Sequence, residues 1–186
     1  MSVESKLIPA GSQTVGPFFR IGLDYLIDRA VEMDAGAGGR IAIHGRVLDR
    51  DGAPVPDAML EFWSPAYTTN AQAASRDFDI PDGFRRAATD MDGSYSIVIR
   101  RPLAIPIEDG RTQAPHLLVL VFARGLLRHL ISRVYFDGEP ANESDLVMLG
   151  VPAERRHTLV AKSESENAYR WDVILQGGKE TVFFAW

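Results

Sequence analysis

The four histidines are the side chains of this sequence best suited to bind a metal or move a proton at neutral pH. His116 and His129 lie in two apolar runs joined by Arg124-Gly125, a hairpin signal that places His129 opposite Leu120 and four residues along from His116. At about 3.3 Å per residue the two rings are about 13 Å apart, whereas ligands of one metal lie within about 4 Å of each other. We therefore expect no metal ion shared between them. His44 and His157 are expected to have structural or solvent-exposed roles.

Other patterns that could carry chemistry are weak. Asp90-Met-Asp92-Gly93 is similar to the start of a calcium loop, but the bidentate acid expected several residues later is missing, which favours a turn. Arginine pairs at 85–86, 100–101 and 155–156 are expected to be solvated or to donate in ion pairs rather than to form an anion site. The motifs of phosphate loops, dinucleotide sites, zinc proteases and serine hydrolases are absent. The residues by themselves therefore describe no complete active site.

Composition narrows the function classes further. The chain has 186 residues, a net charge of −5 and no cysteine, so it has no disulfide, thiolate metal site or cysteine nucleophile. A negative net charge argues against nucleic acid or an anionic membrane as partner. Since neither a leader pattern nor an apolar run of about 18 residues occurs, we expect a cytoplasmic protein. No linker or repeat divides the sequence, which predicts one domain over residues 1–186.

Short β-rich runs separated by turn signals predict the elements that must position any site. We expect strands at residues 41–48, 58–63, 95–100, 116–122, 127–136, 158–162, 169–175 and 182–186. Only residues 143–149 suggest a helical turn or two. Residues 1–39, with glycines at 36, 38 and 39, are expected to form an irregular N-terminal arm. The fold class predicted is all-β, a β-sandwich or barrel of about eight short strands.

Two segments are too apolar for a half-exposed sheet. In residues 116–122 both the even and the odd positions are apolar, so this strand should be covered on both faces. Residues 181–186, Thr-Val-Phe-Phe-Ala-Trp, also lack a polar face, and an exposed edge of this kind is prone to aggregate. A partner subunit or the N-terminal segment of the same chain could cover these faces, and the sequence leaves both possibilities open.

Several motifs together resemble the intradiol ring-cleavage dioxygenases, from about residue 7 to the end. The pattern of residues 45–63 and 89–95 is shared with prealbumin-like modules. The more specific segments are Ser12-Gln-Thr-Val-Gly-Pro-Phe18, Ala114-Pro-His116, Phe122-Ala-Arg-Gly125, Arg133-Val-Tyr-Phe-Asp137, Arg155-Arg-His-Thr-Leu-Val-Ala161 and Gly178-Lys-Glu-Thr-Val-Phe-Phe184. The resemblance implies an intradiol dioxygenase-like, prealbumin-like β-sandwich. Within the family it is similar to the α chain of the members that pair two homologous chains.

In such pairs the resemblance implies that the β chain holds a ferric, non-haem iron through two tyrosines and two histidines, the histidines in a His-x-His strand. This sequence has His116-Leu117-Leu118 there, so one histidine is replaced by leucine. The first tyrosine maps near Ala71, and Tyr67 stands too close to Trp63 to replace it. No tyrosine occurs between Tyr95 and Tyr135 to supply the second. The resemblance therefore implies a chain that binds no iron and has no catalytic residue of its own.

The resemblance implies that this chain lines part of the partner's substrate pocket. The residues implied to line the pocket are Thr14, Gly16, Pro17, Phe18 and Arg124. An arginine at the entrance would attract an anionic substrate beside an apolar wall. The implied reaction cleaves 3,4-dihydroxybenzoate with O2 to 3-carboxy-cis,cis-muconate, in an obligate hetero-oligomer with the iron-binding β subunit. A prealbumin-like binding or structural module without a catalytic role is the alternative.

Overall fold

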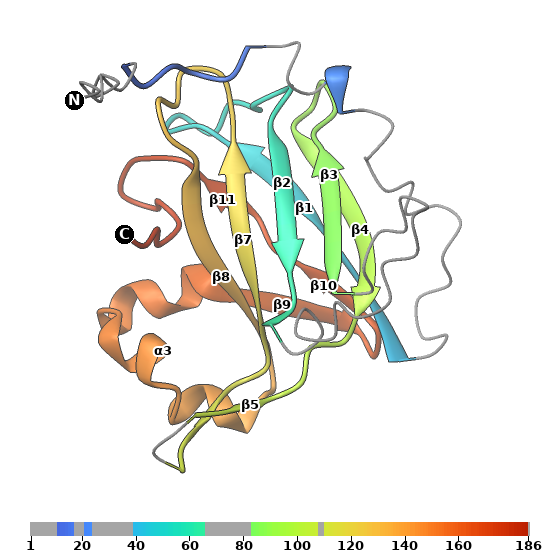
Figure 1. The fold of residues 1–186 in the computed structure, drawn as a ribbon, viewed down its shortest axis with the longest axis vertical. Helices are drawn as coiled ribbons and strands as arrows, with labels where there is room; N and C mark the ends of the chain where they lie inside the picture. Colours follow the sequence, from blue (N-terminus) through green and yellow to red (C-terminus); the bar gives the residue numbers. More distant parts are fainter. Residues whose placement is uncertain (1–10, 17–20, 24–38, 66–82, 108–109, 186) are drawn as a thin grey trace, which may run out of the picture.

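The computed structural model describes residues 11–16, 21–23, 39–65, 83–107 and 110–185. The described part of the chain is built mainly of strands, which confirms the all-β class (Figure 1). The strands are β1 (Arg40–Leu48), β2 (Met59–Trp63), β3 (Phe84–Ala88), β4 (Ser94–Arg100), β5 (Ile105–Pro106), β6 (Thr112–Gln113), β7 (His116–Phe122), β8 (Leu130–Phe136), β9 (Val160–Ser165), β10 (Ala168–Arg170) and β11 (Val173–Ile174). The helical elements between β8 and β9 are the 3-10 helix η5 (Pro140–Glu143), the α-helix α3 (Leu146–Gly150) and the 3-10 helix η6 (Ala153–Leu159). None of the helices described is long and apolar enough to cross a bilayer.

Nine of these strands form one nearly closed sheet. Its order is β11-β1-β10-β9-β8-β7-β2-β3, and β4 also pairs with β1. In Figure 1, β2, β7 and β8 lie in front of β1, and the parallel pairing of β8 with β9 joins the front to the back. The structure thus shows a curled sheet of more strands than the eight expected, and β5 with β6 forms a separate short hairpin.

The core lies inside the curl and follows the alternation of the strands. On β7, Leu117, Val119 and Val121 point inward and are fully buried. They pack in one cluster with the inward residues of β1 and β4, including Ile43 and Ile97. Because side chains alternate across a strand, the even positions of β7 must lie on the outer face.

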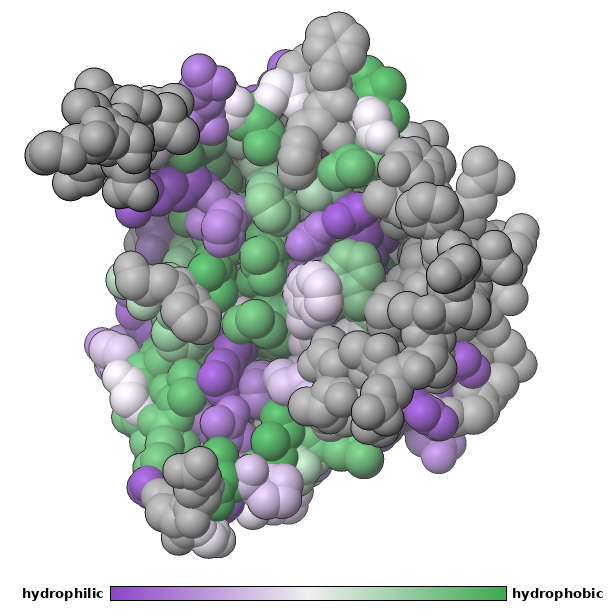
Figure 2. Space-filling model, viewed as in Figure 1, coloured by the Kyte–Doolittle hydropathy of each residue, from purple (hydrophilic) through white to green (hydrophobic). Residues whose placement is uncertain are grey.

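That outer face is only partly covered by the described chain. Leu118, Leu120 and Phe122 of β7 are half-buried, as is Trp63 of β2, whose ring centroid lies 4.2 Å from that of Phe84. Figure 2 shows apolar residues gathered along the middle of this face. The prediction that residues 116–122 are covered on both sides therefore holds for the inner face of this chain and stays open for the outer one.

Several predicted boundaries were wrong. The strand expected from residue 127 begins at Leu130, because residues 123–129 form the connection that starts with the turn at Arg124-Gly125. The strand expected over 169–175 is interrupted at Trp171 and Asp172, and the Asp172 carboxylate accepts from the Arg46 backbone N–H. Residues 181–185 form no strand; the Phe184 N–H donates to the Ile131 carbonyl at 2.8 Å. The helical prediction for residues 143–149 is confirmed by η5 and α3.

Candidate functional site

The described N-terminal segment lies on the tip of the β7–β8 hairpin. The Gly125 backbone N–H donates to Thr14 Oγ1 at 2.7 Å, across 111 positions of sequence. Gly125 has a φ of 88°, a left-handed conformation that glycine adopts without steric cost. The turn thus directs its N–H toward the Thr14 hydroxyl. Thr14 and the Arg124-Gly125 tip, predicted from the sequence to share a site, are brought together.

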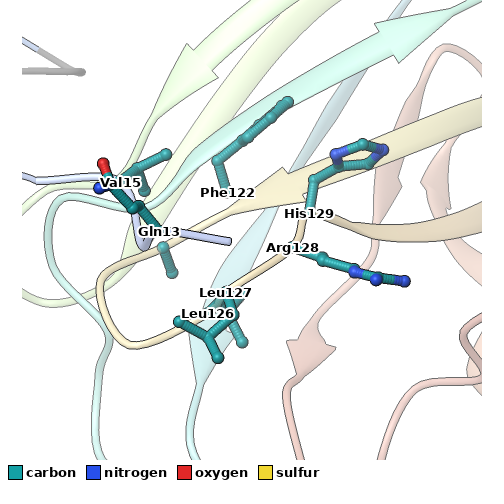
Figure 3. A pocket seen from close by; sticks show the side chains of 8 residues that line it. Gln13, Val15, Phe122, Leu126, Leu127, Arg128 and His129 are labelled. Carbon is teal, nitrogen blue, oxygen red and sulfur yellow. The ribbon is translucent and has the colours of Figure 1, made fainter. Parts of the chain in front are cut away.

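A small pocket forms where the segment meets the connection after β7. It has a volume of about 160 Å³ and is lined by Gln13, Val15, Phe122, Ala123, Leu126, Leu127, Arg128 and His129. Figure 3 shows the Arg128 side chain extending away from the other labelled side chains. The ring centroids of Phe122 and His129 lie 5.4 Å apart. The pocket therefore combines apolar walls with an exposed imidazole.

Arg124 stands at the hairpin tip with its charge partly paired. Its Nη2 lies 3.3 Å from Asp57 Oδ2, and the Arg124 side chain is 55% exposed. Asp57 precedes β2 and has a φ of 61°, in the left-handed region that aspartate tolerates better than most residues. The carboxylate therefore orients the guanidinium and offsets part of its field, while much of the side chain stays open to solvent.

The remaining predicted pocket residues are placed only in part. Gly16 is exposed, and a Cβ there would meet no atom within 4 Å in the described structure. Pro17 and Phe18 lie outside the described residues, as do Tyr67 and Ala71. Asp57 was missed by sequence reasoning. Its only local signal is a Pro-Asp pair in a turn, and its contact with Arg124 depends on the tertiary fold.

The hairpin register corrects one sequence expectation. His129 lies beyond the last ladder pair, Val121 with Leu130, so it stands beside Phe122 and not opposite Leu120. The connection between β7 and β8 is longer than a tight two-residue turn, so the pairing of the two strands is shifted by two residues from the one expected. His129 is therefore further from His116 than expected, and the conclusion that the two cannot share an ion stands.

His44 and His157 take the roles expected, whereas the arginine pairs do so only in part, because Arg85 is buried and donates to the Val98 carbonyl. His44 Nε2 lies 2.7 Å from Glu164 Oε2, and His157 is exposed. Arg86 pairs with Glu61, and Arg156 donates to the carbonyls of Val151 and Leu149. The other arginines of these pairs also make internal contacts: Arg85, Arg100, Arg101 and Arg155. Asp90-Met-Asp92-Gly93 is a turn, in which the Gly93 N–H donates to the Asp90 carbonyl at 2.9 Å.

The residues of this chain do not fit the iron site that the resemblance implies for the partner. His116 Nδ1 lies 2.8 Å from the Ala114 carbonyl, so only Nε2 of this ring is available to bind a metal. The apolar Leu118 stands where the family's His-x-His motif has its second histidine. Across residues 11–16, 21–23, 39–65, 83–107 and 110–185, no group of three or more His, Cys, Asp or Glu side chains could hold a metal ion. We therefore assign no metal-dependent step to residues of this chain.

Comparison with known proteins identifies the relatives. A family model described as Dioxygenase matches residues 23–177. The chain is 40% identical to the protocatechuate 3,4-dioxygenase alpha chain of Burkholderia cepacia, over 93% of this chain and 95% of the relative. It is 34% identical to the alpha chain of Pseudomonas putida, over 93% of this chain and 94% of the relative. The beta chain of Burkholderia cepacia is 29% identical, over 92% of this chain and 77% of the relative.

Solved structures agree in fold. Hydroxyquinol 1,2-dioxygenase from Pseudomonas putida DLL-E4 has a TM-score of 0.59 at 21% identity, over 93% of this chain and 64% of that one. The dioxygenase domain of a carbohydrate-binding fusion from a Streptomyces species has a TM-score of 0.57 at 21% identity, over 82% and 89%. The resemblance found in the sequence is confirmed, and the chain belongs to the intradiol dioxygenase family, with the alpha chains of protocatechuate 3,4-dioxygenase among its relatives.

Proposed function

We propose that this chain, a single domain over residues 1–186, is the metal-free α subunit of a protocatechuate 3,4-dioxygenase. The observation that carries the proposal is the similarity over nearly the whole length to two alpha chains, combined with a donor set around His116 that does not suit iron. The similarity to a beta chain supports descent of the two subunits from one ancestor.

The reaction proposed belongs to the pair. A homologous β subunit would hold Fe(III), which would supply the activation of the catechol toward O2, and the pair would cleave 3,4-dihydroxybenzoate to 3-carboxy-cis,cis-muconate. This chain contributes shape and charge to the entrance and is inactive alone. The two layers of its curled sheet fit the β-sandwich of the family, and a chain without cysteine suits the cytoplasm.

We place the entrance at the contact between the N-terminal segment and the hairpin tip. Thr14, Gly16, Pro17, Phe18 and Arg124 are the residues proposed to line it. The hydrogen bond from Gly125 to Thr14 supports this, because it holds the segment beside the guanidinium. Arg124 would draw in the substrate carboxylate, with Asp57 fixing the direction of its side chain.

The β subunit is proposed to cover the outer face of β7 and β2. Leu118, Leu120 and Phe122 leave a partly exposed apolar strip there, as stable hetero-oligomer interfaces do. Covering it would complete the two-sided burial that the sequence of β7 predicts. We therefore propose that the association is obligate rather than transient.

The test is to express the tagged chain with and without the homologous iron-binding chain of the same host. With it, we expect copurification, ferric iron and activity on protocatechuate. Alone, we expect neither stoichiometric iron nor activity. A tyrosinate-to-iron absorption band in the isolated chain would refute the metal-free role, and failure to copurify would favour an independent prealbumin-like module.

A further inference from the structure

A groove opens on the outer face of β9 and β10, beside the turn that follows β11. Its volume of about 700 Å³ lies in the range of small-molecule sites. Val160 and Ile174 are half-buried and give the groove apolar walls, while the lining cations Lys162, Arg170 and Lys179 are exposed. None of the described residues that line it belongs to β2 or β7, so the groove lies apart from the apolar strip proposed for the β subunit.

The three cations stand at the two ends of the groove. Lys162 of β9 and Arg170 of β10 are ladder partners, so their side chains lie side by side on one face of the sheet. Lys179 lies in the turn that joins Ile174 to Thr181, and the Thr181 N–H donates to the Ile174 carbonyl at 2.9 Å. This hydrogen bond returns the turn to β11 and places Lys179 at the Ile174 end.

Asp172 is the one carboxylate among the described residues that line the groove, and both of its oxygens have partners. Its Oδ2 lies 3.1 Å from Arg170 Nη2, and its Oδ1 accepts from the Arg46 backbone N–H at 3.0 Å. Counting lysine, arginine and carboxylate side chains, the lining has three positive charges and one negative charge. A surplus of two positive charges thus gathers here, in a chain with a net charge of −5.

The acids that neighbour the groove are held by other groups. Glu164 of β9 pairs with His44 at 2.7 Å, and Glu180 pairs with Arg155 at 3.6 Å. Within the described ranges no acidic side chain forms an ion pair with either lysine of the groove. The two ammonium groups are therefore available to an anionic ligand.

We propose that this groove binds an open-chain dicarboxylate. One carboxylate would contact Lys162 and Arg170, and the other would contact Lys179. The carbon chain between them would lie against Val160 and Ile174. All of these residues belong to this chain, so the binding is independent of the proposed function.

The distance between the two ends sets the length of the ligand. Arg170 pairs with His44 of β1, and Ile174 pairs with Leu48, four positions further along that strand. At about 3.3 Å per residue these ends are about 13 Å apart. An extended chain of about six carbons separates its terminal carbons by about 6 Å, and the flexible lysine stems can span the rest.

The probe is adipate, titrated into a dilute solution of the complete chain and followed by saturation-transfer NMR. We expect saturable binding, weakened about fivefold when one carboxylate is replaced by a methyl group in hexanoate. Lys162→Gln and Lys179→Gln should each weaken adipate binding by a similar factor. Lys179→Gln should also bind adipate and hexanoate equally, because only one end of the groove then holds a carboxylate. Added salt should weaken adipate binding, since the contacts are exposed.

The matched control is Arg100→Gln, which removes an equal charge from an exposed position of β4. Arg100 is the ladder partner of Arg40, at the opposite end of β1 from the groove, so this variant should bind adipate as the wild type does. Circular dichroism checks that each variant is folded. Absence of saturable binding at millimolar adipate would overturn the proposal, and so would equal affinity of the wild type for adipate and hexanoate. A loss in Arg100→Gln as large as in the lysine variants would show attraction to the overall charge and would overturn it as well.

Discussion

Arg124 pairs with Asp57, and in the proposed function it would also attract the substrate carboxylate. Asp57 holds its guanidinium at 3.3 Å, which keeps the side chain directed but reduces its pull on an anion. An exposed pair of this kind contributes only about 0–1 kcal/mol, so a substrate carboxylate can share the guanidinium without breaking the fold. The hairpin tip is thus suited to transient attraction and not to tight binding.

Arg124→Ala in the assembled pair should raise KM for protocatechuate more than it lowers kcat. Loss of a partly exposed charge contact costs roughly 1–2 kcal/mol, or about 5–30-fold in affinity, and it acts on ground-state binding. Uncharged catechol should be affected much less, and added salt should narrow the gap between wild type and variant. Steady-state kinetics with both substrates measures this.

The complementary variant is Asp57→Asn. Asparagine suits the left-handed backbone at that position, and its neutral side chain no longer forms an ion pair with the Arg124 guanidinium. It should lower KM for protocatechuate by up to about fivefold, the equivalent of one exposed ion pair. An unchanged KM in both variants would remove Arg124 from the entrance. Equal effects on catechol would point to weakened assembly instead.

His116 should make the fold sensitive to mild acid. The pKa of His116 is lowered in the folded state, mainly by burial. Below the unfolded value of 6.5, the unfolded chain therefore binds a proton at His116 more readily than the folded chain does. The stabilisation is therefore present above pH 6.5 and is lost as the pH falls, by at most about 1.4 kcal/mol per pH unit.

Denaturant unfolding of the wild type and His116→Leu between pH 7 and pH 5 tests this. The variant should lose less stability over the interval. His157→Leu, a change at an exposed histidine, should retain the wild-type slope. Parallel slopes in the wild type and His116→Leu would show that His116 protonates equally in both states.

At the scale of elements, β1 has no room for a side chain at Gly45. A Cβ at Gly45 would lie 1.8 Å from the Trp171 carbonyl oxygen and 3.2 Å from the Tyr95 hydroxyl. That hydroxyl donates to the same carbonyl at 2.6 Å, in a buried bond. The close approach therefore allows the link between β10 and β11 to pack against β1 and β4.

Gly45→Ala should destabilise the protein by about 3 kcal/mol or more, since the obstructing atoms are backbone and cannot rotate away. Gly150→Ala is the control, because a Cβ there meets nothing within 4 Å, and its effect should stay within about 0.5 kcal/mol. Thermal unfolding of both variants decides the matter. A Gly45→Ala variant as stable as the control would disprove the steric argument.

How far the sequence predicts the structure differs between elements. β1, β4 and β7 were predicted because their buried residues alternate with period two or form an apolar run. β3 was missed because its Phe-Arg-Arg-Ala-Ala sequence looks solvated. Arg85 is in fact buried and donates to the Val98 carbonyl, while Arg86 pairs with Glu61 of β2. Polar residues satisfied only by distant partners leave no local pattern.

The residues of the candidate site also differ in how well the sequence predicts them. The motifs around Thr14 and Arg124 indicated a shared site through family resemblance, and the Gly125–Thr14 hydrogen bond brings them together. The Arg124–Asp57 pair joins residues from separate turns, so periodicity and spacing could not predict it. Pro17 and Phe18 remain predictions.

At the scale of the molecule, the apolar strip along β7 should control assembly. Expressed alone, the chain should self-associate or be poorly soluble, and the strip should bind a hydrophobic dye. Coexpression with the iron-binding chain should remove the dye signal and yield a defined hetero-oligomer, measured by light scattering. A dispersed monomer at micromolar concentration without dye binding would contradict obligate pairing.

The pairing of β1 with β10 and β11 also governs when the protein can fold. Ala42 pairs with Ala168 and Val47 with Val173, so β1 takes these neighbours from strands that lie far along the sequence. During synthesis, that edge of β1 stays unpaired until β10 and β11 have been made. Such long-range closure slows folding and leaves an unpaired edge exposed until it is complete.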